Sequence, residues 1–153
     1  MSYRMTEEER QNFLAGVHVA VLALTELGRG PLAVPIWYGY EPGGEIWFTT
    51  ERDSHKGRLL TEGARVSLCV QTETAPYQYV SVEGPVTRIE PSNIERDTRP
   101  LAHRYLGAKR GDRYVETTGG EEGHRGSIRV SVKPERWFTV DYGKVGGAAV
   151  GGD

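Results

Sequence analysis

The segment from Ile46 to Val70 constrains the fold more than any other part of the chain. It reads IWFTTERDSHKGRLLTEGARVSLCV, an apolar strand followed by a polar turn, a short helix and a second apolar strand. Thr49 and Thr50 end the first strand, and Ser54 can cap the helix that follows. The turn therefore predicts hydroxyls and free backbone N–H groups beside Lys56, an arrangement that suits a phosphate.

The composition indicates one soluble domain. A chain of 153 residues can form one domain with a substantial core but is short for two. No apolar run approaches the ~20 residues of a membrane helix. The first residues, MSYRMTEEERQNF, lack an apolar signal core, so we expect a cytoplasmic protein with no membrane partner. We expect the domain to span 1–142 and a flexible glycine-rich tail to span 143–153.

Several classes of site are disfavoured by the residue pattern. A net charge of −2 argues against a nucleic-acid partner, whose affinity rests mainly on neutralised phosphates. Cys69 is the only cysteine and lies in an apolar strand, so we expect a buried, inert thiol. No GxSxG motif marks a nucleophile. We also expect no metal, because no HxH or HxxxH spacing joins any of the histidines, which are His18, His55, His103 and His124.

The order of predicted elements is mainly β. Thr6 and Glu9 form a capping box that predicts a helix over 7–15. Runs rich in β-branched and aromatic residues, separated by glycine turns, predict strands at 17–25, 31–40, 45–50, 65–72, 77–90 and 127–142. A short helix is expected at 54–62, between two of these strands. Five or six mostly antiparallel strands of this kind predict a small barrel or sandwich.

The later half of the chain carries weaker signals. We expect a bend or bulge at Gly84-Pro85 within the long strand. Ser92 and Glu95 suggest a second capping box, and Pro100 should interrupt the helix that it opens before 101–106. The polar, glycine-rich stretch 108–126 predicts a surface loop or a short helix that adds little to the core.

Pro35 lies within an otherwise ordinary strand and has two interpretations. It can mark an edge strand, or its missing N–H can leave the amides of Ile36 and Trp37 free to contact a planar heterocycle. Similarly, His55 can present an N–H to an anion or be an exposed helix residue. The strand aromatics can fill the core or line a wet cleft; they are Trp37, Tyr38, Tyr40, Tyr77 and Tyr79.

Three segments in this order resemble the split-barrel flavin and deazaflavin oxidoreductases, the pyridoxamine 5′-phosphate oxidase-like superfamily. They are PLAVPIWYGY, IWFTTERDSHKGRLLTEGARVSLCV and YQYVSVEGPVTRI. The short chain and the TTERDSHK turn are similar to the actinobacterial branch that uses coenzyme F420. The chain shows no counterpart of the C-terminal substrate-phosphate motif of pyridoxamine phosphate oxidase itself.

The resemblance implies a six-stranded antiparallel split β-barrel with short peripheral helices. It also implies a homodimer that binds its cofactor at the subunit interface. Pro35, Ile36 and Trp37 would contact the ring, and Tyr77 and Tyr79 would close the pocket from the partner subunit. The residues implied around the phosphate are Thr49, Thr50, Ser54, His55, Lys56 and Arg58.

The function implied by the resemblance is hydride transfer from reduced F420 to a small conjugated organic acceptor. The first alternative keeps the fold and uses FMN. A second alternative is a barrel that binds a ligand or single-stranded nucleic acid without catalysis, using its aromatics as stacking platforms. We expect the cofactor to perform the chemistry and no side chain to be essential as an acid or base.

Overall fold

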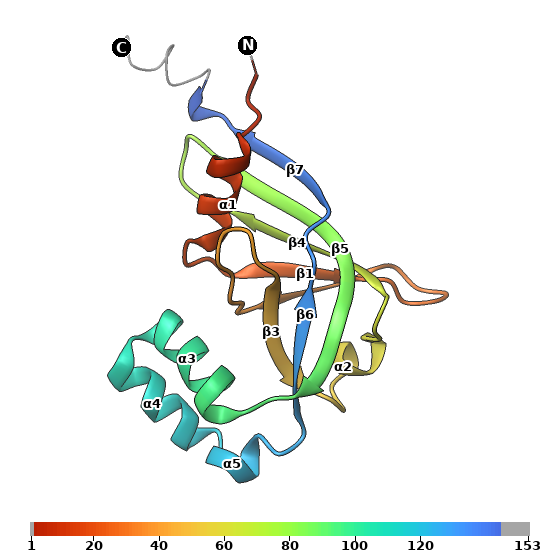
Figure 1. Cartoon of the computed structure of the whole chain (residues 1–153), viewed down its shortest axis with the longest axis vertical. Helices are drawn as coiled ribbons and strands as arrows, with labels where there is room; N and C mark the ends of the chain where they lie inside the picture. The colour runs from red at the N-terminus through yellow and green to blue at the C-terminus, as the bar shows by residue number, and fades with distance from the viewer. Residues whose placement is uncertain (1, 145–153) are drawn as a thin grey trace.

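The computed structural model describes residues 2–144, which form a strongly curved antiparallel sheet with short helices around it (Figure 1). Six strands are hydrogen-bonded in the order β2-β1-β4-β5-β6-β3, and β7 pairs with β5 beside this path. The strands are β1 (Ala20–Leu24), β2 (Leu32–Ile36), β3 (Ile46–Glu51), β4 (Arg65–Gln71), β5 (Gln78–Pro91), β6 (Ser127–Val132) and β7 (Arg136–Asp141). The predicted mainly β split barrel is confirmed.

The seventh strand arises because the predicted strand 127–142 is divided. Its first part, β6, pairs with β3 and with the second half of β5. Its second part, β7, pairs with the first half of β5. Lys133, Pro134 and Glu135 link the two parts, and proline cannot donate to a strand ladder. One predicted strand therefore contributes to both halves of the curved sheet.

The bulge in β5 lies two residues beyond its predicted position. The pairing register with β6 shifts between Val86 and Arg88, so the extra residue is Thr87 and not Gly84 or Pro85. Gly84 is required for a different reason: a Cβ atom there would collide with the carbonyl oxygen of Lys133. Gly84 is thus explained by the close approach of the Lys133 backbone. The bulge at Thr87 allows β5 to bend from one half of the sheet to the other.

Alternation along the strands builds the core. Ala20, Leu22 and Leu24 are buried on one face of β1, and Ile46 and Phe48 are buried on one face of β3. Successive strand residues point to opposite faces, so the residues between them face outward. The two aromatic rings from the segment after β2 that join this core are Tyr38 and Tyr40.

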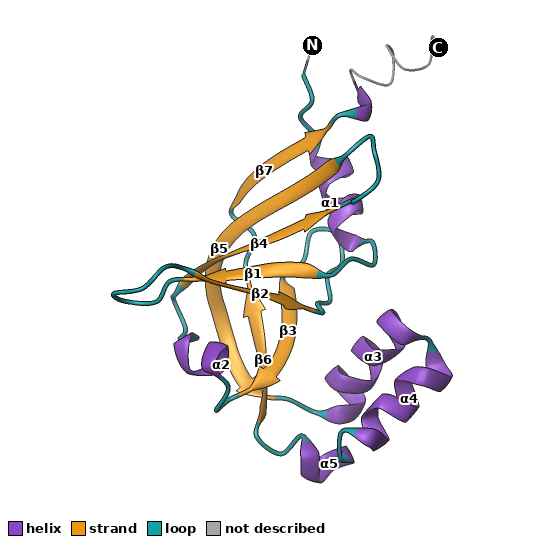
Figure 2. Cartoon of the chain, turned by 180° about the vertical axis from the view of Figure 1, so that it is seen from behind, coloured by secondary structure: helices purple, strands orange, loops and turns teal. Residues whose placement is uncertain are grey.

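Six short helical segments within residues 2–142 surround the sheet. They are α1 (Glu7–Ala15), α2 (His55–Leu59), the π-helix η1 (Ile94–Thr98), α3 (Arg99–Leu106), α4 (Ala108–Thr117) and α5 (Gly120–Gly123). The capping box of α1 is confirmed, because Thr6 Oγ1 accepts from Glu9 N–H at 3.1 Å and the Glu9 carboxylate accepts from Thr6 N–H at 2.8 Å. Figures 1 and 2 both show α3, α4 and α5 together on one side of the sheet.

The expected second capping box is wrong. Asn93, one residue after Ser92, accepts from the N–H of Arg96 at 2.9 Å and caps η1. Pro100 lies in the first turn of α3, where its missing N–H removes no intrahelical bond, so the helical path continues through it. The stretch 108–126 is also more regular than expected. It contains α4 and α5, and Val115 of α4 is buried.

The helices α3 and α4 form a tight hairpin. A Cβ atom at Gly111 would lie 2.9 Å from the carbonyl carbon of Ala102 and from the nitrogen of His103, so only glycine permits this approach. Asp112 ties the two helices together, because its Oδ1 lies 2.6 Å from His103 Nε2 and accepts from Arg99 Nη1 at 2.7 Å. The hairpin is therefore a compact unit.

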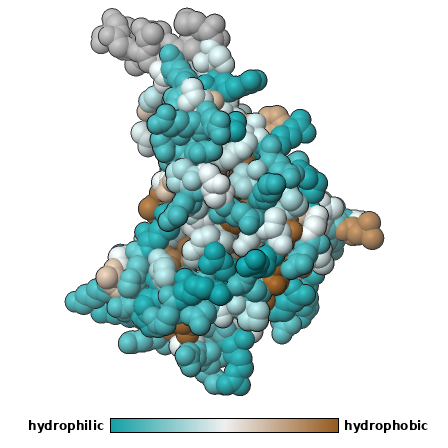
Figure 3. Space-filling view, in the orientation of Figure 1, coloured by the Kyte–Doolittle hydropathy of each residue, from teal (hydrophilic) through white to brown (hydrophobic). Residues whose placement is uncertain are grey.

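The surface seen in Figure 3 is mainly hydrophilic. Leu27, at the tip of the β1–β2 hairpin, is 99% exposed. Among residues 2–144, no helix has both the length and the apolar content to cross a membrane. The predicted tail lies outside the described residues from 145 onward.

Candidate functional site

A hollow of about 350 Å³ lies between the end of β2, the start of α2 and the α3–α4 hairpin. Five of the predicted cofactor residues line it, from two separate parts of the sequence. Three further residues that line it were not predicted. We call it the Trp37 hollow, and its lining residues are Val19, Pro35, Ile36, Trp37, Thr49, Lys56, Leu101 and Tyr114.

Thr49 and Lys56 bring a hydroxyl and a cation to the lining of the Trp37 hollow. Thr49 faces outward from β3, because its neighbours Phe48 and Thr50 are buried. Lys56 is in the first turn of α2 and is partly buried. A hydroxyl and an ammonium group therefore both line the hollow. Together they can bind an anion through a charge-assisted hydrogen bond.

Thr50 and Ser54 have structural roles in the turn. Ser54 caps α2 as predicted, since its Oγ accepts from Gly57 N–H at 3.1 Å. The same hydroxyl donates to the carbonyl of Glu51 at 2.7 Å and lies 3.2 Å from Thr50 Oγ1. Neither hydroxyl lines the Trp37 hollow. The hydrogen bonds of these side chains hold the turn that presents Lys56.

His55 and Arg58 also point elsewhere than the Trp37 hollow. His55 Nε2 lies 3.0 Å from Glu26 Oε1, and both residues line a separate depression beside the β1–β2 hairpin. Arg58 is exposed and lines neither space. Of the cations in the turn, Lys56 is the one that the structure brings to the Trp37 hollow.

Pro35 occupies an edge strand, which confirms the first of its two interpretations. β2 ends the hydrogen-bonded path, and Pro35 pairs with Val21 of β1. Pro35 also lines the Trp37 hollow with the next two residues of the strand segment, Ile36 and Trp37. The edge position therefore places this backbone at the wall of the candidate site.

The indole of Trp37 is held by two tyrosines of the helical hairpin. It stacks on Tyr105 with centroids 5.0 Å apart and planes 5° from parallel, and it contacts Tyr114 at 5.2 Å and 49°. The Tyr105 hydroxyl donates to His18 O at 2.6 Å and accepts from Tyr38 N–H at 3.1 Å. The hairpin therefore fixes the aromatic wall, a role that no pattern in 108–126 indicated.

The other strand aromatics separate into core and surface. Tyr38 is fully buried and donates to the carbonyl of Leu14 at 2.6 Å, and burial raises the pKa of its phenol. Tyr40 is also buried, so the core interpretation is confirmed for both. Tyr77 is 53% exposed, and Tyr79 is partly buried on β5. Neither lines the Trp37 hollow of its own chain.

Apart from Lys56, the described titratable side chains show no arrangement for catalysis or metal binding. Burial raises the pKa of the half-buried Cys69 thiol, which disfavours the reactive thiolate. Burial lowers the pKa of His18, whose ring stacks on Phe13 at 4.6 Å. Within residues 2–144, no three His, Cys, Asp or Glu side chains come together as a metal site would require. The Trp37 hollow is thus suited to binding a flat anionic ligand.

Solved structures with a similar fold include three of interest. The conserved hypothetical protein Rv2991 from Mycobacterium tuberculosis is 25% identical, with a TM-score of 0.73 over 95% of this chain and 90% of that one. An F420 reductase is 21% identical, with a TM-score of 0.68 over 84% and 94%. A FAD and haem binding protein from Mycobacterium smegmatis is 18% identical, with a TM-score of 0.65 over 90% and 72%.

The search of curated proteins gives no match. A family model described as pyridoxamine 5′-phosphate oxidase matches residues 6–141, nearly the whole described chain. This match covers every strand of the sheet and every residue that lines the Trp37 hollow. The chain therefore belongs to the pyridoxamine 5′-phosphate oxidase family.

Proposed function

We propose that the protein is an oxidoreductase that uses coenzyme F420 in the Trp37 hollow to reduce a small conjugated organic acceptor. One observation carries the proposal: Thr49 and Lys56 line a hollow whose other lining residues are apolar or aromatic. That division suits a planar ring that bears a phosphate. The likeness of the fold to an F420 reductase supports the same cofactor.

Each wall has a distinct task in this proposal. The Lys56 ammonium and the Thr49 hydroxyl bind the phosphate. The rigid edge from Pro35 to Trp37 lies against the ring, and Val19 packs beside it. Leu101 and Tyr114, from the helical hairpin, cover the ring and exclude water.

Reduced F420 supplies a hydride when it is bound. The protein's own contribution is to fix the ring and the acceptor in contact, which is catalysis by positioning. No histidine lines the Trp37 hollow, so its described walls hold no imidazole as a general acid. The proton that the acceptor needs then comes from solvent or from a tyrosine hydroxyl.

FMN is the second candidate, because it also combines a flat ring with a phosphate. The fold likeness to a FAD and haem binding protein favours a flavin. The cations around the turn, Arg52, Lys56 and Arg58, would favour the longer anionic tail of F420. Glu51 and Asp53 alternate with them in the sequence, so this preference is modest.

We also propose that the protein is a homodimer whose interface is the outer face of the sheet. One row of side chains crosses five paired strands on this face. It consists of Pro35, Val21, Cys69, Ser81 and Phe138, each in direct register with the next. Val21 is 43% exposed and Phe138 is 52% exposed. We call this row and its exposed neighbour Val19 the outer apolar face.

The position of the outer apolar face connects it to the site. Pro35 and Val19 belong both to this face and to the wall of the Trp37 hollow. A second copy packed on the face would therefore cover the open side of the hollow. Tyr79 lies on β5, two strands from β1, and Tyr77 just precedes β5. In the proposed dimer they reach the partner's hollow, as the resemblance implies.

A fluorescence titration of the purified protein with F420 and with FMN tests the cofactor. We expect saturable binding of F420, followed by reduction of conjugated enones or quinones by the reduced complex. Tight binding of FMN with no binding of F420 would show that the cofactor is FMN. Binding of neither cofactor would overturn both versions and leave a ligand-binding barrel without catalysis.

A further inference from the structure

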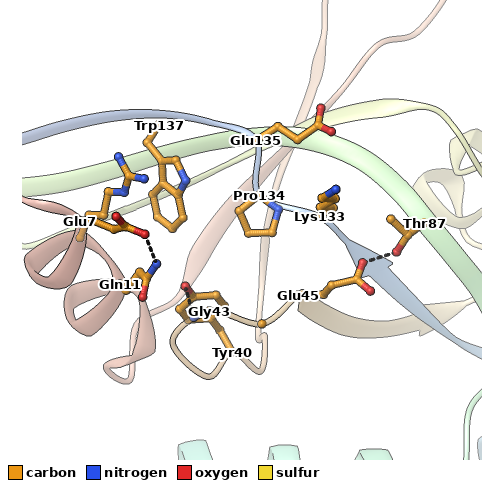
Figure 4. Close-up of a pocket in the computed structure, with 12 residues that line it drawn as sticks. Glu7, Gln11, Tyr40, Gly43, Glu45, Thr87, Lys133, Pro134, Glu135 and Trp137 are labelled. Carbon is orange, nitrogen blue, oxygen red and sulfur yellow. Dashed lines mark hydrogen bonds between the residues drawn. The ribbon is translucent and has the colours of Figure 1, made fainter.

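A second hollow, of about 590 Å³, lies between α1, the loop after Tyr40 and the link from β6 to β7 (Figure 4). We call it the Trp137 hollow. It shares no residue with the Trp37 hollow and is larger. Its volume lies within the range of small-molecule sites. The residues that the argument uses are Glu7, Arg10, Tyr40, Glu45, Lys133 and Trp137.

Two aromatic rings give the Trp137 hollow an apolar lining. Tyr40 is 5% exposed, and Trp137 is partly buried and packs against the core. Figure 4 shows these two side chains on facing sides of the space, one from β7 and one from the loop after β2. The guanidinium of Arg10 lies over the Trp137 ring, 4.7 Å from its centroid. A flat apolar group would therefore find ordered ring surface here.

The carboxylates at this hollow already have partners. Glu45 accepts from the hydroxyl of Thr87, as Figure 4 shows. Glu135 accepts from Arg65 Nη1 at 2.9 Å. Glu7 accepts from the side-chain amide of Gln11 at 3.4 Å, a weaker contact. Arg65 therefore neutralises Glu135, whereas Glu7 and Glu45 bond to neutral groups and keep their charge.

The two cations that line the Trp137 hollow are Arg10 and Lys133, and they differ from the carboxylates in their contacts. In the described part of the chain, neither Arg10 nor Lys133 forms a salt bridge with a carboxylate. Arg10 Nε is buried and has no hydrogen-bond partner among the described residues. Because Nε is closed to solvent, a ligand oxygen in the hollow would bind the terminal Nη groups of the Arg10 guanidinium instead.

We propose that the Trp137 hollow is a second binding site, for a small planar carboxylate. The ligand carboxylate accepts from the Arg10 guanidinium and lies near the Lys133 ammonium. Its planar body packs between Trp137 and Tyr40. The site is independent of the cofactor, because the ligand touches none of the residues at the Trp37 hollow.

Calorimetric titration with benzoate tests the proposal. Two matched probes keep the ring and change the charge: benzamide is neutral and benzylamine is cationic. We expect saturable binding of benzoate that is at least about tenfold tighter than binding of either control, the value of one charge-assisted bond. The indole N–H signal of Trp137, assigned in NMR spectra with Trp137→Phe, should shift during the benzoate titration only.

Variants locate the site. Arg10→Gln should weaken benzoate binding by about tenfold or more, while Arg4→Gln, an exposed cation outside the hollow, should not. If Arg10→Gln fails to fold, Lys133→Gln changes an exposed side chain and should still weaken binding. The proposal is overturned if benzoate does not saturate by about 10 mM, where a millimolar complex would be nearly full. Equal binding of benzylamine, or unchanged binding by Lys133→Gln, would also overturn it.

Discussion

The indole of Trp37 and the phenol ring of Tyr105 lie parallel, 5.0 Å apart at their centroids and 5° apart in plane. This stack joins the wall of the Trp37 hollow to the α3–α4 hairpin. The hydroxyl of Tyr105 extends the connection, since it donates to His18 O and accepts from Tyr38 N–H. The hairpin thus sets the position of a side chain that directly follows strand β2.

Tyr105→Phe should keep the stack and lose these two hydrogen bonds. We expect the free energy of unfolding to fall by about 1–3 kcal/mol, because buried backbone groups lose their partner. Tyr105→Leu should also release the Trp37 ring and weaken cofactor binding further than Tyr105→Phe does. Urea unfolding and cofactor titration measure the two effects. Tyr142→Phe is the matched control, since Tyr142 is exposed. An equal effect of the control would contradict the role given to Tyr105.

Lys56→Ala should weaken cofactor binding without unfolding the protein. The lost charge-assisted bond is worth about 1.5–3 kcal/mol, or roughly ten- to a hundredfold in the dissociation constant. Arg58→Ala is the comparison variant and should weaken binding less, because Arg58 lies in the same helix but outside the Trp37 hollow. Fluorescence titration compares the three proteins. If the Arg58 variant binds the cofactor as weakly as the Lys56 variant does, cofactor affinity depends on general electrostatic attraction and not on a specific contact between Lys56 and the phosphate.

Val21→Glu should break the proposed homodimer. A charge at the centre of the outer apolar face would have to be buried against the second copy, which is costly without a partner. The wild type should sediment at about twice the chain mass of 17.0 kDa, and the variant at the chain mass. Leu27→Glu, at the exposed hairpin tip, should remain dimeric. Cofactor affinity should fall with the loss of the dimer, and a wild-type monomer that binds cofactor tightly would contradict an interface site.

Asp97 should make the stability of the protein depend on acid pH. Burial opposes its ionisation, but hydrogen bonds from Arg96, from Asn93 N–H and from Arg129 together hold its pKa below the ordinary value of 3.8. The stability from this depressed pKa is fully present above pH 3.8 and is lost as the pH falls through the folded-state pKa.

Asp97→Asn should therefore cost about 1–3 kcal/mol of unfolding free energy at neutral pH and remove this acid dependence. The unfolding curves of the wild type and the variant should converge below pH 3.8. Asp112→Asn, which changes a more exposed carboxylate in α4, should cost much less. Parallel unfolding curves at every pH would show that Asp97 does not act through its charge.

The parts of the fold that sequence patterns predicted are those with local causes. The turn from Thr49 to Lys56 follows from an alternating strand and a serine cap, and both are present. The hairpin α3–α4 depends on distant contacts instead. Gly111 resembles a helix breaker in the sequence, yet its missing Cβ is what lets α4 approach Ala102 and His103. Sequence periodicity does not show how two helices pack, so around Tyr114 it predicts only a surface loop or a short helix that adds little to the core.

The distinction between local causes and distant contacts also explains which site residues could be predicted. The type of residue alone was enough to indicate Lys56 as a phosphate ligand. It could not distinguish a hydroxyl that faces a ligand from a hydroxyl whose hydrogen bonds hold the turn. Thr49 and Thr50 are adjacent and chemically identical, and the strand alternation directs only Thr49 to the Trp37 hollow. Ser54 is a helix cap first, and its lone pairs are used there. The direction in which the fold points each side chain therefore decides which of two identical residues can contact a ligand.

The final prediction concerns acid–base chemistry. If hydride transfer needs only positioning, substitution of any histidine by Ala should lower turnover by less than the ~100-fold expected for a lost general acid. The structure gives each histidine a partner away from the Trp37 hollow. These pairs are His18 with Phe13, His55 with Glu26, His103 with Asp112 and His124 with Thr118.

Turnover of the reduced cofactor complex, measured beside cofactor affinity and thermal stability, separates the possible effects of these substitutions. A histidine that only supports the fold should lose stability and turnover together. His18 tests this most directly, because its backbone carbonyl, which remains in His18→Ala, is what accepts from Tyr105. One histidine whose loss abolished turnover while affinity and stability stayed intact would identify a dedicated proton donor. In that case positioning alone could not account for catalysis.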